Sequence, residues 1–196
     1  TPVTVLDYAS LYPSSMISEN LCHTSIVDEN NEDSKKYLGD EGIKELKKIG
    51  YGYEDITYDV FKWINPNIKS KGKDKCGKKT CRFVQPLDGS KSVLPNKLRD
   101  LLKARKSTRK KIVYKTIINN NNKSYSGLMS INEDTYEILS ENGEKYNINK
   151  NDVKSINDTY NEFEKSVYDG LQLAFKMTAN SLYGQLGAST SPISYK

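Results

Sequence analysis

Asp7 is an aspartate whose neighbours suit ion or phosphate chemistry. It follows the run "TPVTVL" and precedes "YASLYPSSMISENL". The Thr and Val residues favour a strand ending at Asp7, and Pro13 suits the first turn of a helix. A carboxylate between a strand end and a helix N-terminus stands where ligands commonly bind. The alternative is that Asp7 is a turn residue and Tyr12 a core residue.

A second candidate group is the arginine of "LPNKLRDLLKARKSTRKKIVYK", residues 94–115, which predict a helix with Pro95 in its first turn. Leu98 and Leu101 define an apolar stripe, and Arg105 lies seven and four residues after them, on the same stripe. The other basic residues of this helix are expected to scatter over its solvent faces. An inward Arg needs an acidic partner or an anionic ligand, unless its long stem reaches out to water.

A third group comes from "GLQLAFKMTANSLYGQLG", where polar residues follow spacings of four, four and three: Gln172, Lys176, Asn180 and Tyr183. This spacing places them on one face of a helix. Such a face presents an amide, a cation and an aromatic ring to one ligand, or is simply a solvent-facing stripe. Together with Asp7 and Arg105 it supplies the parts of a phosphoryl-transfer site, which works by positioning and charge neutralisation.

The elements that must hold these residues are read from local patterns. Strands are expected at 3–7 and around "DITYDVF" and "TCRFVQ", with a Lys- and Gly-rich loop at 65–79 between the latter two. Helices are expected at 13–21, 40–49, 94–115 and 157–183, the last closed by Gly184. Between the two long helices we expect a structureless linker, "INNNNK", and then three short strands within 125–153. Asn142-Gly143 predicts a type I′ hairpin turn.

Composition narrows the class of protein. The chain has 196 residues, a net charge of +5, 36% hydrophobic residues and no apolar run near the roughly 18 residues that span a bilayer. Two basic clusters, at 69–82 and 97–111, would attract phosphate backbones or be solvated faces. Three cysteines and one histidine argue against a disulfide framework and indicate an intracellular, reducing compartment. Cys76 and Cys81 lack the second pair of a zinc site.

Three segments resemble motifs of the family B DNA polymerases. "DYASLYPSSMISENLC" resembles motif A, written D-x-x-S-L-Y-P-S, and "KMTANSLYGQLGA" resembles motif B, written K-x-x-x-N-S-x-Y-G. "LLKARKSTRKKI" resembles the fingers segment that carries the triphosphate-binding Arg. The motifs stand in the family's order and anchor residues 1–27, 93–115 and 157–191. The amino-acid sequences of "KTCRFVQP", "DTYNEFEKSVYDGLQLAFK" and the β insertion are similar to those of the polymerases of large DNA viruses.

The resemblance implies a role for each matching residue. Asp7 would coordinate two catalytic Mg²⁺ ions, with help from the backbone carbonyl of Tyr8. The turn at Ser10, Leu11 and Tyr12 would aim N–H groups at the β- and γ-phosphates, and the Tyr12 ring would be the steric gate against a ribose 2′-OH. The triphosphate would be gripped by Arg105, Lys176 and Asn180. Tyr183 would line the nascent base pair, and Gly184 would let the duplex approach.

The resemblance also implies an α+β fold: part of a polymerase palm, a long antiparallel helical fingers hairpin and a small β insertion. Palm residues would be 1–93, with a polar and basic insertion at 28–80. The fingers would be 94–183, with the β insertion at about 116–156, and 184–196 would return to the palm. Motif C, Y-G-D-T-D-S, supplies the second metal-binding aspartate and is absent from the sequence. We therefore expect a piece of a longer protein, inactive alone.

The implied function is template-directed DNA synthesis in replication, by deoxynucleotide transfer to a primer 3′-OH. Expected partners are primer–template DNA, deoxynucleoside triphosphates and a processivity factor, with no membrane. A viral enzyme would act at a cytoplasmic replication site or in the nucleus of its host. One alternative is a non-catalytic nucleic-acid-binding relative, which the retention of Asp7, Lys176 and Asn180 disfavours. Another is a nucleotidyltransferase that selects ribonucleotides, which Tyr12 disfavours.

Overall fold

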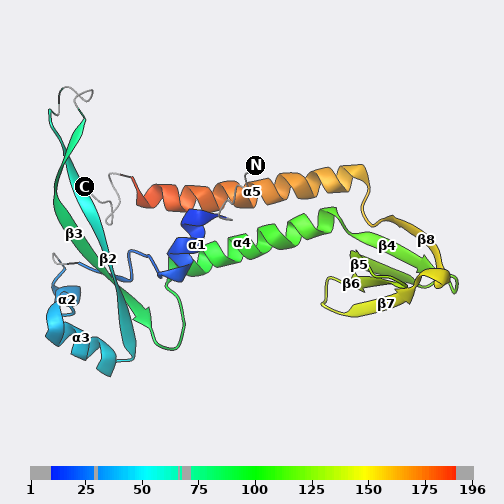
Figure 1. The fold of residues 1–196 in the computed structure, drawn as a ribbon, viewed down its shortest axis with the longest axis horizontal. Helices are drawn as coiled ribbons and strands as arrows, with labels where there is room; N and C mark the ends of the chain where they lie inside the picture. Colours follow the sequence, from blue (N-terminus) through cyan, green and yellow to red (C-terminus); the bar gives the residue numbers. More distant parts are fainter. Residues whose placement is uncertain (1–9, 29–30, 66, 68–71, 189–196) are drawn as a thin grey trace, which may run out of the picture. The chain divides into compact units, whose positions relative to one another are not determined.

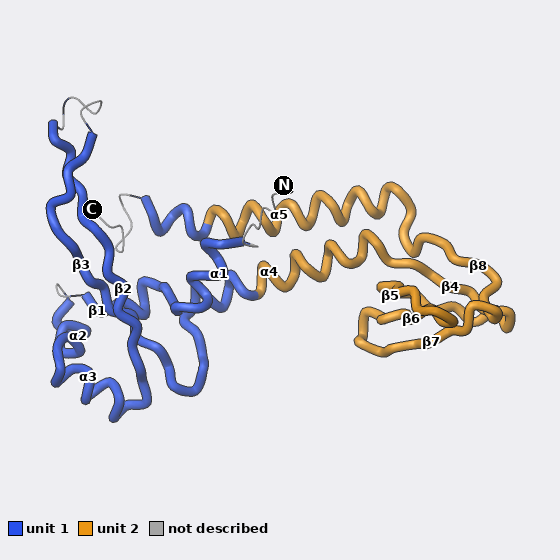
Figure 2. The backbone as a smooth tube through the Cα atoms, viewed as in Figure 1, with its two compact units in different colours: residues 1–99, 182–196 blue, residues 100–181 orange. Residues whose placement is uncertain are grey.

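The computed structural model describes residues 10–28, 31–65, 67 and 72–188 (Figure 1). The chain divides into two compact units. Unit 1 comprises residues 1–99 and 182–196, and unit 2 comprises residues 100–181 (Figure 2). Helices α4 (Val93–Ile112) and α5 (Glu162–Leu186) each belong partly to both units. Helices and antiparallel strands together confirm the α+β class. The strand expected at 3–7 lies outside the described residues.

Unit 1 is built around a long antiparallel ribbon, β2 (Tyr51–Trp63) and β3 (Lys73–Pro86), in a sheet of order β1-β3-β2. Three helices and the short strand precede this ribbon in the chain: α1 (Leu11–Ser18), β1 (Ile26–Val27), α2 (Glu32–Lys35) and α3 (Gly39–Lys48). The loop expected at 65–79 is wrong in extent, because β3 already begins at Lys73. Its lysines find partners across the ribbon: Lys73 lies over the Trp63 ring and Lys75 pairs with Asp59 at 2.8 Å.

Unit 2 contains an antiparallel sheet of order β7-β6-β5-β4-β8. Its strands are β4 (Lys115–Asn119), β5 (Ser124–Ile131), β6 (Thr135–Leu139), β7 (Lys145–Asn149) and β8 (Val153–Asp158). Strand β5 pairs with β4 up to Gly127 and with β6 from Leu128 onward. A Cβ atom at Gly127 would lie 2.2 Å from the Leu139 carbonyl oxygen, so this crossing point requires glycine. The core of the sheet joins Ile117 of β4 to Ile138 and Ile148.

Two turns of this sheet, the one between β4 and β5 and the one between β6 and β7, are of one kind. After β4, the Asn122 N–H donates to the Asn119 oxygen at 2.9 Å, and Asn122 has a φ of 58°. After β6, the Gly143 N–H donates to the Ser140 oxygen at 3.1 Å, and Gly143 has a φ of 89°. Each is a three-residue hairpin loop that ends in a left-handed residue. The expected type I′ turn is therefore wrong, since Asn142 has no positive φ.

The linker expected at "INNNNK" is also wrong, because these residues close the β4–β5 hairpin. Asparagine tolerates the left-handed conformation better than most residues, and the Asn119 side chain accepts from the N–H groups of Asn121 and Lys123 at 3.1 and 2.8 Å. The repeat of asparagines is thus a turn with its own hydrogen bonds. The low-complexity composition of this segment did not indicate the turn.

The two long helices are confirmed, but their inner ends differ from expectation. Helix α4 ends at Ile112 and α5 begins at Glu162, because the intervening ends pair as strands in the register Lys115↔Asp158. A reciprocal capping box starts α5: the Asn161 N–H donates to Glu164 Oε2, and the Glu164 N–H donates to Asn161 Oδ1, both at 2.9 Å. Gly184 does not close α5, which continues to Leu186.

Candidate functional site

The first turn of α1 carries the residues that the motif A resemblance selects. Ser10 is the N-cap and adopts a left-handed conformation, with φ 57° and ψ 55°. Its carbonyl accepts from the Ser14 N–H at 2.9 Å, but its side chain makes no capping bond. Leu11 and Tyr12 follow as the first helical residues, whose N–H groups have no acceptor inside a helix. This turn can therefore donate hydrogen bonds to an anion.

Tyr12 is a surface residue, with 64% of its area exposed. Its ring stacks on Tyr183 of α5, with ring centroids 5.1 Å apart and planes inclined by 20°. Both residues belong to unit 1. The alternative that Tyr12 is a core residue is wrong, since a core ring would be enclosed. The pair instead forms an aromatic surface beside the start of α1.

Asn20, which the sequence analysis missed, holds α1 in place. The residue is fully buried and has a φ of 52°, so the chain reverses there after the helix. Its side chain donates to the Val84 carbonyl of β3 at 3.0 Å and accepts from the Ser92 N–H before α4 at 2.7 Å. An asparagine directly after a helix is a known signal for a left-handed end. That signal was present in the sequence.

In unit 2, α4 and α5 run antiparallel and side by side (Figure 1). The half-buried Arg105 side chain donates from Nε to Gln172 Oε1 at 3.3 Å, and Gln172 donates to Asp169 Oδ1 at 3.1 Å. No carboxylate among the described residues forms an ion pair with Arg105. The guanidinium is thus oriented by a neutral amide, which leaves its charge available to an anion.

The remaining motif B residues lie on the surface of α5. Lys176 and Asn180 are exposed and one turn apart, and among the described residues no hydrogen bond or ion pair joins either to Arg105. Gly184 is exposed in the last turn, with open space where a Cβ atom would be. Asp7 and Tyr8 lie outside the described residues. The structure therefore brings together Tyr12 with Tyr183, and Arg105 with Gln172.

Comparison with known proteins decides the family. The family model of DNA polymerase family B matches residues 1–124 and 147–194, which is most of the chain. The chain belongs to DNA polymerase family B. Both helix segments with candidate residues lie inside the match, whereas residues 125–146 of the β insertion lie outside it. No solved structure matches the chain.

Individual family B relatives include viral and cellular proteins. A DNA polymerase of Pyramimonas orientalis virus is 47% identical over 100% of this chain, and one of Phaeocystis pouchetii virus is 35% identical over 97%. The DNA polymerase delta catalytic subunit of Schizosaccharomyces pombe is 30% identical over 96% of the chain. The chain spans 15% of the length of the two viral relatives and 10% of the yeast protein.

A metal ion in a protein is held by clustered His, Cys, Asp or Glu side chains. Within 10–28, 31–65, 67 and 72–188, no group of three or more His, Cys, Asp or Glu side chains could hold a metal ion. The residues that the motif A resemblance assigns to metal binding, Asp7 and Tyr8, lie outside the described part of the chain. None of the helices described combines the length and hydropathy needed to cross a bilayer.

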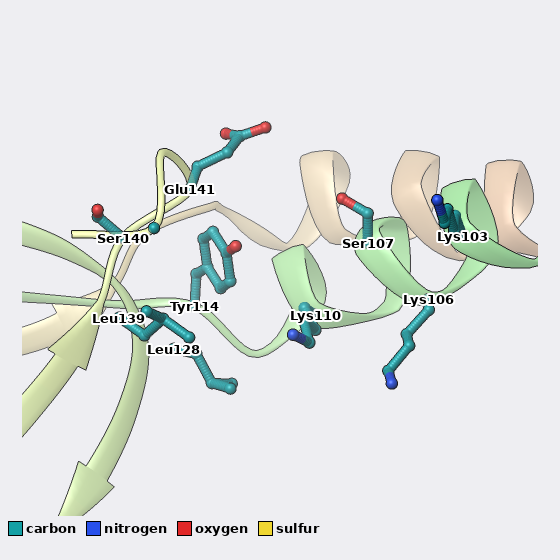
Figure 3. Close-up of a pocket in the computed structure, with 10 residues that line it drawn as sticks. Lys103, Lys106, Ser107, Lys110, Tyr114, Leu128, Leu139, Ser140 and Glu141 are labelled. Atoms are coloured by element: carbon teal, nitrogen blue, oxygen red, sulfur yellow. The ribbon is translucent and has the colours of Figure 1, made fainter. Parts of the chain in front are cut away.

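One further feature of this family B chain escaped the sequence analysis. Lys103, Lys106 and Lys110 line a single pocket of unit 2 (Figure 3), and Lys103 and Lys106 are exposed, as expected for the solvent faces of this helix. Their spacing of three and four residues is the signal of one helix face.

Proposed function

We propose that the chain is part of a DNA-directed DNA polymerase, which transfers deoxynucleotides to a primer 3′-OH during replication of viral DNA. Unit 1 would contribute to the palm, and the α4–α5 pair would be the fingers. One observation carries the proposal: the exposed Tyr12 ring, stacked on Tyr183 beside a helix start that can donate to an anion. A surface tyrosine in this setting suits contact with a ligand.

In this proposal the Tyr12 ring lies under the sugar of the incoming nucleotide. A deoxyribose fits above the ring, whereas a ribose 2′-OH collides with it. The stack on Tyr183 fixes the orientation of the Tyr12 ring, because a rotation of the ring would break the aromatic contact. Tyr183 and Gly184 line the nascent base pair from the end of α5.

Three side chains and one turn bind the triphosphate. The backbone N–H groups at Ser10, Leu11 and Tyr12 face the β- and γ-phosphates, and Arg105 and Lys176 neutralise their charge. Arg105 is suited to this because Gln172 orients it without neutralising it. Asn180 adds a neutral hydrogen-bond donor one turn after Lys176.

The ligands of a bound Mg²⁺ would be the Asp7 carboxylate and the Tyr8 carbonyl, with further ligands from elsewhere in the full-length protein. The metal would supply charge neutralisation at the phosphates. Primer–template DNA and deoxynucleoside triphosphates are the proposed substrates, and a processivity factor is a proposed partner. The site of action would be a cytoplasmic or nuclear replication site of an infected host.

Steady-state incorporation of one deoxynucleotide by the full-length protein tests the proposal. Arg105→Ala and Lys176→Ala should each lower kcat/KM for the nucleotide by about 10- to 100-fold, the range expected for a lost charge-assisted hydrogen bond. Lys97→Ala is the matched control, since Lys97 is an exposed cation of α4. Equal kcat/KM values in Arg105→Ala and Lys97→Ala would contradict the proposal.

A further inference from the structure

A basic pocket lies in unit 2, where the face of α4 meets the β insertion. It encloses about 320 Å³, and three lysines of α4 line one side: Lys103, Lys106 and Lys110. Lys106 and Lys110 extend to the same side of the helix (Figure 3). The opposite wall comes from strands β5 and β6 through Leu128 and Leu139. All of these residues belong to unit 2.

The charge of this pocket is left uncompensated. Among the described residues, none of the three lysines forms an ion pair with a carboxylate. The pocket also contains Glu141, but its carboxylate pairs with Lys111 at 2.7 Å and points away from the two leucines (Figure 3). Like charges three and four residues apart destabilise a helix by a few tenths of a kcal/mol. A polyanion bound between them would remove that repulsion.

The arrangement suits a row of phosphates joined by sugars. Lys103 and Lys110 are seven residues apart in α4, which is about 10.5 Å of helix rise, so the three lysines match a repeating charge better than a single ion. The apolar wall of Leu128 and Leu139 suits the sugar carbons between phosphates. A double helix is a stiff rod, whereas a single strand can bend into a hollow of this size.

Family membership does not account for the apolar wall. The family model matches Lys103, Lys106 and Lys110 but not residues 125–146, which include Leu128, Leu139 and Glu141. The pocket is therefore formed jointly by a helix inside the family match and by strands of the insertion outside it. This distinguishes it from the residues of the proposed nucleotide site.

We propose that this basic pocket, lined by Lys103, Lys106 and Lys110, binds the phosphodiester backbone of single-stranded DNA. The inference rests on the proposed function, because it takes the nucleic acid of that function as the ligand. The α4 lysines neutralise successive phosphates, and the insertion supplies the surface against which the strand lies. Its binding should depend strongly on salt, since each neutralised phosphate releases counterions.

Lysine acylation of the full-length protein, read by mass spectrometry, tests this site directly. A saturating single-stranded oligodeoxythymidine should slow acylation of Lys103, Lys106 and Lys110, and leave the rates at exposed lysines of the insertion unchanged: Lys123, Lys145 and Lys154. In parallel, the triple variant Lys103→Gln, Lys106→Gln, Lys110→Gln should reduce the slope of log binding constant against log salt by about 2, at about 0.7 for each lost phosphate contact. The control triple variant Lys123→Gln, Lys145→Gln, Lys154→Gln removes the same charge and should keep the slope.

Several results would overturn the inference. These are no protection by the oligonucleotide, protection by tripolyphosphate or by duplex DNA but not by the single strand, or equal slopes in the two triple variants. Single-nucleotide incorporation by the unmodified protein is measured on the same preparation. Incorporation without protection would refute this site alone, whereas failure to incorporate would refute the proposed function.

Discussion

At the scale of single residues, Tyr12 is the side chain whose role is most readily tested. If its ring excludes the 2′-OH, Tyr12→Ala in the full-length protein should admit ribonucleotides, while Tyr12→Phe should keep most of the discrimination. The loss in the deoxy-to-ribonucleotide ratio of kcat/KM should exceed about 100-fold, since a clash in a closed site costs more than one missing methylene. Single-nucleotide incorporation with each nucleotide type gives the ratio.

The exposure of Tyr12 supplies the control for this experiment. Because 64% of the residue is exposed, Tyr12→Ala should barely change the thermal midpoint of unfolding. A full loss of discrimination at an unchanged midpoint would support the steric role. An unchanged ratio would refute it and leave the roles of Arg105 and Lys176 standing.

Asn20 is the residue on which the position of α1 depends. Asn20→Ala should lower the free energy of unfolding by about 2–4 kcal/mol, because two partly buried backbone groups, the Val84 carbonyl and the Ser92 N–H, lose their fully buried partner. Chemical denaturation of the full-length protein measures the change in the transition that includes unit 1. Asn147→Ala, at an exposed position of β7, is the control. Equal effects of the two changes would show that Asn20 does not anchor α1.

Sequence motifs located the candidate residues far better than they located residues that support them. The types and order of Arg105, Lys176 and Asn180 could be read directly, because the chemistry of phosphates demands them. Asn20 could not be read as an anchor, since its partners lie 64 and 72 residues away in the chain. Side-chain hydrogen bonds of that span leave no periodic signal.

At the scale of elements, Asp158 joins the end of β8 to two other elements. Its carboxylate pairs with Lys115 of β4 and with Lys165 of α5, and these hydrogen bonds lower the pKa of Asp158 to about 2. A carboxylate with a lowered pKa in the folded state stabilises that state fully above its ordinary pKa of about 3.9. This contribution is lost as the pH falls from about 4 through about 2.

Thermal unfolding of the full-length protein between pH 6 and pH 2 checks this linkage. The unmodified protein should lose midpoint temperature on acidification through this window more steeply than Asp158→Asn, which has no proton to gain at this position. The two curves should approach each other toward pH 2, where Asp158 takes up a proton in the folded state as well as in the unfolded state. Parallel curves over the whole range would exclude a contribution from this carboxylate.

Some elements are specified by local sequence patterns, whereas others depend on residues far away in the chain. The helices could be predicted because Leu98 and Leu101 repeat at helical spacing and Pro95 marks a start. The inner ends of the helices could not be predicted, because Lys115 and Asp158, which are 43 positions apart in the chain, pair as strand residues and do not extend the helices. The asparagine run misled the analysis for a related reason: a turn at Asn122 is specified by the strands on either side.

At the scale of the whole molecule, the β insertion is predicted to be separable from nucleotide chemistry. The Thr159 N–H donates to the Tyr114 oxygen at 3.0 Å, so the chain enters and leaves the insertion at adjacent points. Replacing residues 115–158 by a two-residue turn in the full-length protein should therefore leave single-nucleotide incorporation close to its unmodified rate. Primer extension by one nucleotide measures it.

A deletion with the boundaries suggested by sequence, 125–153, is the informative comparison. It would remove Ile138 and Ile148 and leave Ile117 of β4 without its core partners. That protein should aggregate or be poorly soluble, since an exposed strand edge with apolar side chains invites association. If instead the longer deletion abolished incorporation as completely as Asp7→Ala, the insertion would be part of the catalytic machinery.

The closure of the insertion upon itself has an entropic consequence for the two long helices. A flexible chain as long as residues 115–158 would resist bringing Tyr114 and Thr159 together by about 3 kcal/mol of loop-closure free energy. The hydrogen bonds between β4 and β8 offset this loop-closure free energy when the insertion folds. The folded insertion therefore holds the end of α4 next to the start of α5 and raises the effective concentration of each helix for the other. This effect does not depend on any ligand of the insertion.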